Sequence, residues 1–226
     1  MTQFDFRPEG IRRRTVLAGA GTAAVAFGLG IVPARFALAA DEVPVAELMQ
    51  PDDLKELTLG PPDAKVTVVE YASMTCGHCA RFHKSVFPEL KEKYIDTNKI
   101  YFVMREFPLD NLAAAASMLA RCAGDDKTFP LISVLFDKQA DWAFVKSNPV
   151  PALREIAKQA GFTKESFDAC LKDEDLLDKI MKRRERAASV FGVNSTPTFF
   201  INGKKLAGGT SIEDFSKVID PILNAG

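Results

Sequence analysis

Two cysteines three positions apart, Cys76 and Cys79, stand in the segment CGHC with one of the chain's two histidines, His78, between them. Side chains three positions apart share one face of a helix, so the two sulfur atoms can come within disulfide distance. A cysteine at a helix N-terminus is also favoured as a thiolate, because free backbone N–H groups and the positive end of the helix dipole surround it. The spacing therefore predicts a thiol pair that forms and breaks a disulfide.

The two cysteines are expected to take different roles. Cys76 is predicted to be the exposed nucleophile with a low pKa, and Cys79 to be buried and to resolve a mixed disulfide. His78 is expected to lower the pKa of Cys76 further, by its charge or by a hydrogen bond; the alternative is an exposed loop histidine without a role. His83, four residues beyond Cys79, is interpreted as a packing histidine.

A metal site is the alternative for the same residues. Cys76, Cys79 and His83 could offer three ligands near one helix start. Structural zinc sites draw four ligands, usually from two separated pairs, and the sequence has no second CxxC or HxxxH pair. A c-type haem requires histidine directly after the second cysteine, where this chain has Ala80. The sequence therefore favours redox chemistry over a metal centre.

Two further positions are candidates for the same site. Pro197 stands just before an apolar strand, where a cis peptide bond after Thr196 is a recognised solution. The backbone of Thr196 could then face the cysteines and pair with an extended substrate strand. Glu70 is an acid within an apolar strand, six residues before Cys76. If it is buried, its carboxyl group can relay protons to or from Cys79; the alternative is a solvent-facing Glu70 at the strand end.

These residues need a strand, a turn and a helix to hold them. The segment KVTVVEYAS, residues 65–73, has the β-branched content of a short buried strand. After Cys76 the apolar residues change to helical spacing. They are Cys79, Phe82, Val86, Leu90 and Tyr94. A second strand is predicted at Lys99–Pro108, so the opening unit is β-α-β with a parallel strand pair.

The rest of the chain is predicted to be an all-helical block followed by β-β-α. Amphipathic and alanine-rich segments, several closed by glycine or proline, fill residues 109–192 approximately. A hairpin turning at Asn202-Gly203 follows, and then a helix at about Ser211–Leu223. This is the order of an α/β thioredoxin fold with an inserted all-helical domain. Asp41–Leu57 is acidic and without a clear period, and is expected to be a surface arm.

The N-terminus has the composition of a secretory signal, residues 1–39. A basic start precedes an acid-free, Ala/Gly-rich run at Thr15–Val32, and Ala37–Ala39 form an A-x-A cleavage site. Arg13–Arg14 resemble a twin-arginine export motif. An uncleaved membrane anchor is the alternative, because the run approaches the roughly 18 residues that span a bilayer. The mature chain, residues 40–226, is expected to be one exported domain.

Overall charge and the remaining cysteines add separate constraints. A net charge of −1 and a pI of about 6.2 give no indication of a nucleic-acid partner. Disulfides persist in the bacterial periplasm and outside the cell. With Cys76 and Cys79 paired for chemistry, Cys122 and Cys170 in the helical block are predicted to form a structural disulfide; buried free thiols are the alternative.

The segments VTVVEYASMTCGHCARFH and NSTPTFFINGK, with the inserted helices and the exported N-terminus, resemble the DsbA-like branch of the thioredoxin superfamily. The resemblance implies a periplasmic thiol-disulfide oxidoreductase, without cofactor or metal, that oxidises unfolded or reduced exported proteins. A DsbB-type membrane quinone reductase would reoxidise it. By position, the implied site residues are Cys76, Cys79, His78, Glu70, Thr196 and Pro197. A monomer is expected, because the segment before Leu57 is too short for the dimerisation domain of dedicated periplasmic isomerases.

Two positions depart from the best-known enterobacterial members. Gly77-His78 stands where those members have Pro-His, and Gly-His is the dipeptide of protein disulfide isomerase domains. Thr196 before the proline likewise resembles the periplasmic disulfide isomerases. An isomerase or reductase with the same cysteines is therefore the main alternative to an oxidase, within a reduction-potential range of about −120 to −180 mV. A thiol-based metal-binding or chaperone module is the alternative outside enzymes.

Overall fold

A computed structural model describes residues 42–206 and 211–225, so the expected signal segment and its cleavage site lie outside the described residues. The elements in chain order are α1 (Val45–Leu48), β1 (Leu57–Leu59), β2 (Val66–Ala72), α2 (Gly77–Ser85), α3 (Phe87–Leu90), the π-helical turn η1 (Lys91–Ile95), β3 (Ile100–Glu106), α4 (Asn111–Cys122), α5 (Asp125–Asp137), α6 (Gln139–Trp142), α7 (Val150–Gln159), α8 (Lys164–Leu171), α9 (Glu174–Phe191), β4 (Thr198–Ile201), β5 (Lys204–Leu206) and α10 (Ile212–Asn224). Within these ranges, none of the helices has the length and apolar character needed to cross a membrane.

The strands of the described chain form one mixed sheet in the order β1-β3-β2-β4-β5. The central strands β2 and β3 are parallel, with Val66 opposite Ile100, and the other neighbouring pairs are antiparallel. β4 and β5 turn at Asn202 and Gly203, whose φ angles of 47° and 86° suit a tight hairpin. The predicted α/β order of β-α-β, helices and β-β-α is confirmed.

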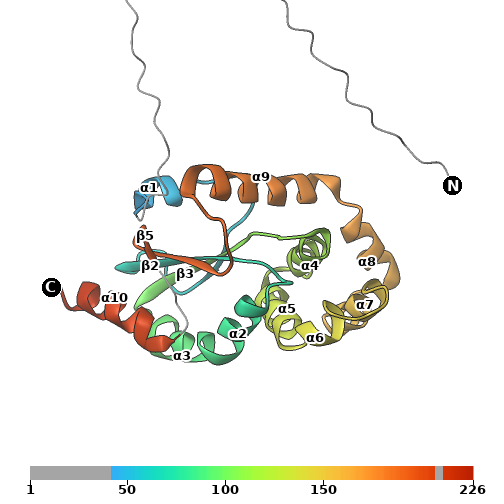
Figure 1. Ribbon diagram of the computed structural model, residues 1–226, viewed down its shortest axis with the longest axis horizontal. Coiled ribbons are helices and arrows are strands. Elements are labelled where there is room, and N and C mark those ends of the chain that lie inside the picture. Colours follow the sequence, from blue (N-terminus) through green and yellow to red (C-terminus); the bar gives the residue numbers. More distant parts are fainter. Residues whose placement is uncertain (1–41, 207–210, 226) are drawn as a thin grey trace, which may run out of the picture. The chain divides into compact units, whose positions relative to one another are not determined.

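β2 alternates its side chains between the two faces of the sheet, because successive strand residues point in opposite directions. Val68 and Ala72 belong to the apolar layer that includes α2 and α10. Val69 and Tyr71 belong to the opposite layer, which includes the end of α9. Figure 1 shows α9 over one face of the sheet and α2, α3 and α10 over the other. By the same alternation, Glu70 lies on the α2 side.

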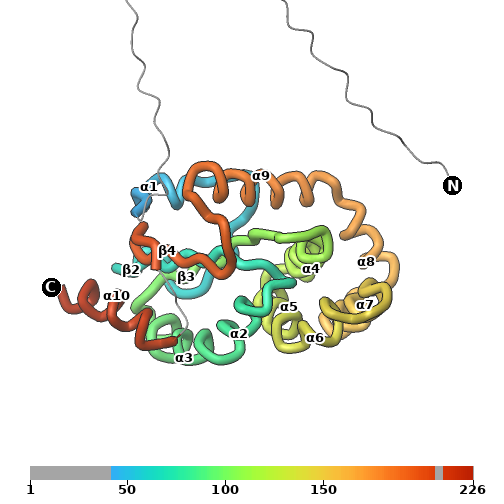
Figure 2. Tube along the Cα trace, in the orientation of Figure 1, coloured from blue at the N-terminus to red at the C-terminus, as the bar shows by residue number. Residues whose placement is uncertain are grey.

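The helices α4–α9 occupy the region predicted as a helical insertion. Figure 2 shows α4–α8 beside the sheet and α9 returning across it toward β4. Ala187 and Phe191 at the end of α9 pack in the same layer as Val69, so this helix is shared between the helical block and the sheet. Cys122 at the end of α4 and Cys170 in α8 are joined by a disulfide.

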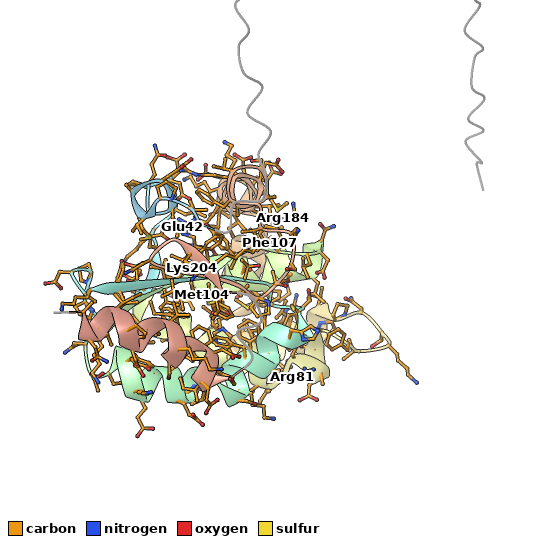
Figure 3. The ribbon with its side chains drawn as sticks, turned by 60° about the vertical axis from the view of Figure 1, so that its left-hand side comes forward. Glu42, Arg81, Met104, Phe107, Arg184 and Lys204 are labelled. Carbon is orange, nitrogen blue, oxygen red and sulfur yellow. A yellow bond between two sulfur atoms is a disulfide. The ribbon has the colours of Figure 1, made fainter. Side chains whose placement is uncertain are left out.

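The described part of the segment expected to be a surface arm, residues 42–57, lies mostly at the surface but is anchored to the fold by a few buried side chains. Val43 and Leu48 are buried, and the Val43 N–H donates to the carbonyl of Gly203 at 2.8 Å. A Cβ at Gly203 would lie 2.0 Å from the Val43 carbonyl oxygen, so this approach requires glycine. Figure 3 shows Glu42 and Lys204 on the same side of the sheet, where they form an isolated bridge. The expectation that this arm stands apart from the domain was wrong, because its anchoring contacts are with residues distant in sequence and leave no local period.

The same segment contributes acids to a buried ion network. Nε of Arg183, on α9, lies 2.7 Å from the Asp52 carboxylate. Nη2 of Arg105, on β3, lies 2.6 Å from Glu56. Arg183 also approaches Glu56 at 3.3 Å and Glu106 at 3.8 Å, and its side chain is only 3% exposed. The network therefore ties α9 and β3 to the segment before β1.

Replacing Arg183 with methionine should lower the free energy of unfolding by about 3 kcal/mol, because it removes a buried cation from the partly exposed carboxylates of Asp52 and Glu56 and from the neighbourhood of the buried Glu106. The measurement is urea unfolding followed by circular dichroism. Lys182→Met is the matched control, since Lys182 is 70% exposed and pairs only at the surface with Asp178. Its effect should stay within about 0.5 kcal/mol. Equal losses in the two variants would contradict a structural role for the network.

Candidate active site

The two cysteines lie where β2 passes into α2. Cys76 is the N-cap residue of α2, with extended φ and ψ of −82° and 117°. Its N–H donates to the Ser73 carbonyl at 3.0 Å, and its own carbonyl accepts the first helical bond from Ala80 at 3.1 Å. Cys79 lies one turn further, on the buried face of α2. Both cysteines are free thiols here, so this is the dithiol form.

Cys76 is more enclosed than expected. It is 8% exposed, whereas Cys79 is completely buried at 0%. The prediction of an exposed Cys76 is therefore wrong, and the prediction of a buried Cys79 is confirmed. The segment before β4 lies against Cys76, where the carbonyl of Thr196 accepts a hydrogen bond from Sγ at 3.2 Å when Cys76 is protonated. Cys76 remains the more accessible sulfur of the two.

The site separates the protonation of the two thiols. Hydrogen bonding from the Cys79 thiol, and then from the Thr196 side chain and the backbone N–H groups of Cys79 and His78, lowers the pKa of Cys76 from about 9 to about 5, against the effect of burial. Burial raises the pKa of Cys79, and hydrogen bonding to Cys76 and the charge of Glu70 raise it further. At neutral pH, Cys76 is therefore a thiolate and Cys79 a thiol.

His78 is exposed, and its backbone N–H is among the groups that lower the pKa of Cys76. The start of α2 therefore contributes to the stability of the thiolate, alongside the Cys79 thiol. A contribution from the His78 imidazole stays a prediction.

Glu70 and His83 form a buried pair beneath the cysteines. Glu70 is 0% exposed, and Nε2 of His83 lies 3.1 Å and 3.0 Å from its two carboxylate oxygens. The solvent-facing alternative for Glu70 is therefore wrong, because β2 turns residue 70 toward α2. The His83 ring stacks on Phe136 of α5, with centroids 4.4 Å apart. The packing interpretation of His83 is confirmed, but sequence reasoning missed its acidic partner.

A signal for this pair was present in the sequence. Glu70 stands in register with the inward positions of its strand, and His83 is one helical turn beyond the buried Cys79. His83 directs Nε2 to Glu70. In the described ranges, no three His, Cys, Asp or Glu side chains form a cluster that could hold a metal ion.

Thr196 and Pro197 bring the start of β4 to the cysteines, and the peptide bond between them is cis. The Thr196 carbonyl contacts Cys76, as described above. The Thr196 hydroxyl is buried and has no hydrogen-bond partner among the described residues of the dithiol form. Because the Thr196 side chain lowers the pKa of Cys76, the thiolate is an acceptor available to this hydroxyl.

Replacing Thr196 with valine should raise the pKa of Cys76 from about 5 toward about 6, because a hydrogen bond to a charged group is lost without a change of shape. Ultraviolet absorbance of the thiolate, followed against pH in the reduced protein, measures this pKa. Thr196→Ser keeps the hydroxyl and should stay close to the unaltered protein. A valine variant with the pKa of the unaltered protein would show that the hydroxyl does not stabilise the thiolate.

Comparisons with known proteins agree with this geometry. A family model described as thioredoxin matches residues 52–221. A Rickettsia bellii protein named as a protein-disulfide oxidoreductase is 39% identical over 171 residues, which are 76% of this chain; the chain spans only about two thirds, 66%, of that protein's length.

In two further relatives, the match to this chain covers most of the relative's length. The crystal structure of alpha-DsbA1 from Wolbachia pipientis is similar with 33% identity and a TM-score of 0.72, over 78% of this chain and 94% of that one. Disulfide bond formation protein D of Bacillus subtilis is 27% identical, over 77% of this chain and 80% of that protein. The chain therefore belongs to the thioredoxin superfamily and, within it, to the DsbA-like proteins.

Proposed function

We propose that the protein is a periplasmic thiol-disulfide oxidoreductase that introduces disulfides into exported proteins through Cys76 and Cys79. The observation that carries this proposal is the position of Cys76 at the N-cap of α2, one turn before the buried Cys79, where the pKa of Cys76 is lowered to about 5. A stabilised thiolate favours the reduced form, and a stabilised reduced form makes the disulfide a stronger oxidant.

The exchange proceeds in two attacks. A substrate thiolate attacks Sγ of Cys76 in the disulfide form; a mixed disulfide forms and Cys79 leaves as a thiolate. A second substrate thiolate then attacks the substrate sulfur of the mixed disulfide, and Cys76 leaves as a thiolate. Two electrons pass from the substrate dithiol to the protein, which ends reduced. Because its pKa is low, Cys76 is a good leaving group in the second attack.

The first attack needs a proton at Cys79. Its raised pKa makes the Cys79 thiolate a poor leaving group, so its departure is assisted when a neighbouring acid protonates it. Glu70 is the buried acid that acts on Cys79: its carboxylate charge raises the pKa of that thiol. In its protonated form, Glu70 gives its proton to the Cys79 sulfur as the disulfide opens, and the resulting carboxylate stays paired with His83. In the reverse direction, Glu70 takes the proton as Cys79 attacks.

Substrate and reoxidant follow from the same site. An extended segment of an unfolded or reduced exported protein would pair with the backbone of Thr196, beside the Cys76 sulfur. The reduced protein would pass its two electrons to a DsbB-type membrane quinone reductase. The secretory composition of residues 1–39 supports export to the periplasm. The protein would work as a monomer, without cofactor or metal.

A measured reduction potential tests the direction of electron flow. Equilibration with glutathione should give a value in the range of about −120 to −180 mV, and a value near that of thioredoxin, about −270 mV, would exclude the oxidase role. Oxidised protein should also form disulfides in reduced ribonuclease. Reactivation of scrambled ribonuclease by the reduced protein would favour the isomerase alternative instead.

A further inference from the structure

The turn that carries Cys76 is held by a side chain from the helical block. Nε2 of Gln139, the first residue of α6, lies 2.8 Å from the Met74 carbonyl oxygen and 3.0 Å from that of Cys76. Gln139 is only 4% exposed, so water does not compete freely for these bonds. One side-chain amide therefore donates hydrogen bonds to two carbonyl groups of the turn at residues 74–76, which we call the redox turn. This turn is more than sixty residues away from Gln139 in the sequence.

The position of Gln139 is itself fixed by the packing of α6 against α5. Trp142, at the other end of α6, is completely buried, and its indole N–H donates to the Leu135 carbonyl at 2.8 Å. The Ala143 N–H donates to the Gln139 carbonyl at 2.8 Å and closes the single turn of α6. α5 also contacts α2 through the stacked rings of Phe136 and His83. The contacts of α6 with α5, and of α5 with α2, therefore fix the position of the Gln139 amide group.

The two bonds orient the peptide groups on either side of the attacking sulfur. The Cys76 carbonyl accepts from Gln139 and from the Ala80 N–H at once. A peptide group held at its carbonyl oxygen is also held at its N–H, because the group is planar. The peptide group between Cys76 and Gly77, at the N-terminal end of α2, is therefore fixed in direction. The next two N–H groups, of His78 and Cys79, follow directly from it and are among the groups that lower the pKa of Cys76.

Gln139 also lies beside Gly77, the first of the two residues between the cysteines. A Cβ built on Gly77 would lie 3.9 Å from Oε1 of Gln139, which is ordinary van der Waals contact. The oxygen end of the amide therefore borders position 77, while its nitrogen end holds the turn. The amide group of Gln139 therefore meets this turn from two directions.

We propose that Gln139 is a positioning residue of the redox site: it holds the carbonyls of Met74 and Cys76 so that the N–H groups at the start of α2 face the Cys76 sulfur. This role rests on the proposed attack by Cys76. It assigns to the helical block a direct part in setting the redox strength of the cysteine pair.

Gln139→Met tests this role, because methionine keeps the length of the side chain and removes both donors. We expect the pKa of Cys76 to rise by about one unit, and the equilibrium constant with glutathione to shift about tenfold toward the disulfide form of the protein. Gln139→Glu should shift both quantities further in the same direction, because a carboxylate would face two carbonyl oxygens. Thiolate absorbance and alkylation at equilibrium measure them.

Thr128→Val is the control for a loss of stability alone. Thr128 is also 4% exposed in the helical block, and its hydroxyl donates to the Gly124 carbonyl at 3.0 Å. This variant should lower the melting temperature and leave the pKa of Cys76 unchanged. If both Gln139 variants behave like Thr128→Val, the positioning role is wrong.

A measurement on the unaltered protein covers the case in which the Gln139 variants do not fold. The NMR signals of the Gln139 side-chain amide should shift with pH in step with the titration of Cys76. Signals that do not move through that titration would overturn the proposal. If Cys76 is not the attacking cysteine, the proposed function is wrong, and the role of Gln139 is wrong with it. If Cys76 attacks but Gln139→Met leaves the pKa of Cys76 unchanged, only the proposed role of Gln139 is wrong.

Discussion

Replacing Cys79 with alanine is expected to turn the protein into a trap that accumulates mixed disulfides. The Cys76 thiolate still reacts with disulfides of other proteins, but the thiol that would resolve the product is absent. Non-reducing electrophoresis of periplasmic extracts should show new bands that dithiothreitol removes. Cys76→Ala, which lacks the attacking sulfur, should show none. Mixed disulfides of equal amount in both variants would contradict the assigned roles.

The same asymmetry should appear in the unaltered, reduced protein. At about pH 6, Cys76 is mostly thiolate and Cys79 is a buried thiol, so alkylation of Cys76 should be faster by on the order of 100-fold or more. Labelling of Cys76 should fall as the pH drops through about 5, because protonation removes the nucleophile. Mass spectrometry of the alkylated peptides gives both rates. Similar rates at the two cysteines would exclude this order of attack.

Glu70→Gln should slow the opening of the Cys76–Cys79 disulfide by about 100-fold, the lower end of the range for general acid–base catalysis. Glutamine keeps the shape of the side chain but cannot give its proton to Cys79 as that sulfur leaves. Stopped-flow reduction of the disulfide by a small thiol measures the rate. Glu92→Gln, at an exposed position of η1, should leave the rate unchanged.

His83→Phe should slow the same step, because it leaves the Glu70 carboxylate buried without a partner once the proton has gone. Phenylalanine can keep the stacking on Phe136, and circular dichroism checks that the variant is folded. The double variant with Glu70→Gln should be no slower than either single variant, since the two residues act as one unit. Slowing that multiplies in the double variant, or no slowing in either single variant, would exclude a shared proton-transfer role.

The sequence by itself determined the features that rest on local patterns. The β-branched run before the cysteines and the apolar stripe after them specified β2 and α2, and so placed Cys76 at a helix N-terminus. Asn202-Gly203 specified the hairpin of β4 and β5, because these residues accept positive φ. Each signal lies within a stretch of 16 residues or fewer and reflects backbone preference or side-chain period. The order of elements, and with it the fold class, followed from these signals.

The tertiary structure alone decided how these elements meet at the site. Cys76 is enclosed because Thr196 lies against it, and Glu70 is buried because β2 turns it toward His83. Gln139 reaches the Cys76 turn because α6 is packed against α5, a contact with no local signature. Val43 and Leu48, in the segment before β1, are buried for the same kind of reason. The period of a sequence determines which face of a helix or strand is apolar, but only the packing determines which segment lies against that face. The segment that lies there then sets the burial, the hydrogen bonds and the pKa of each side chain at the contact.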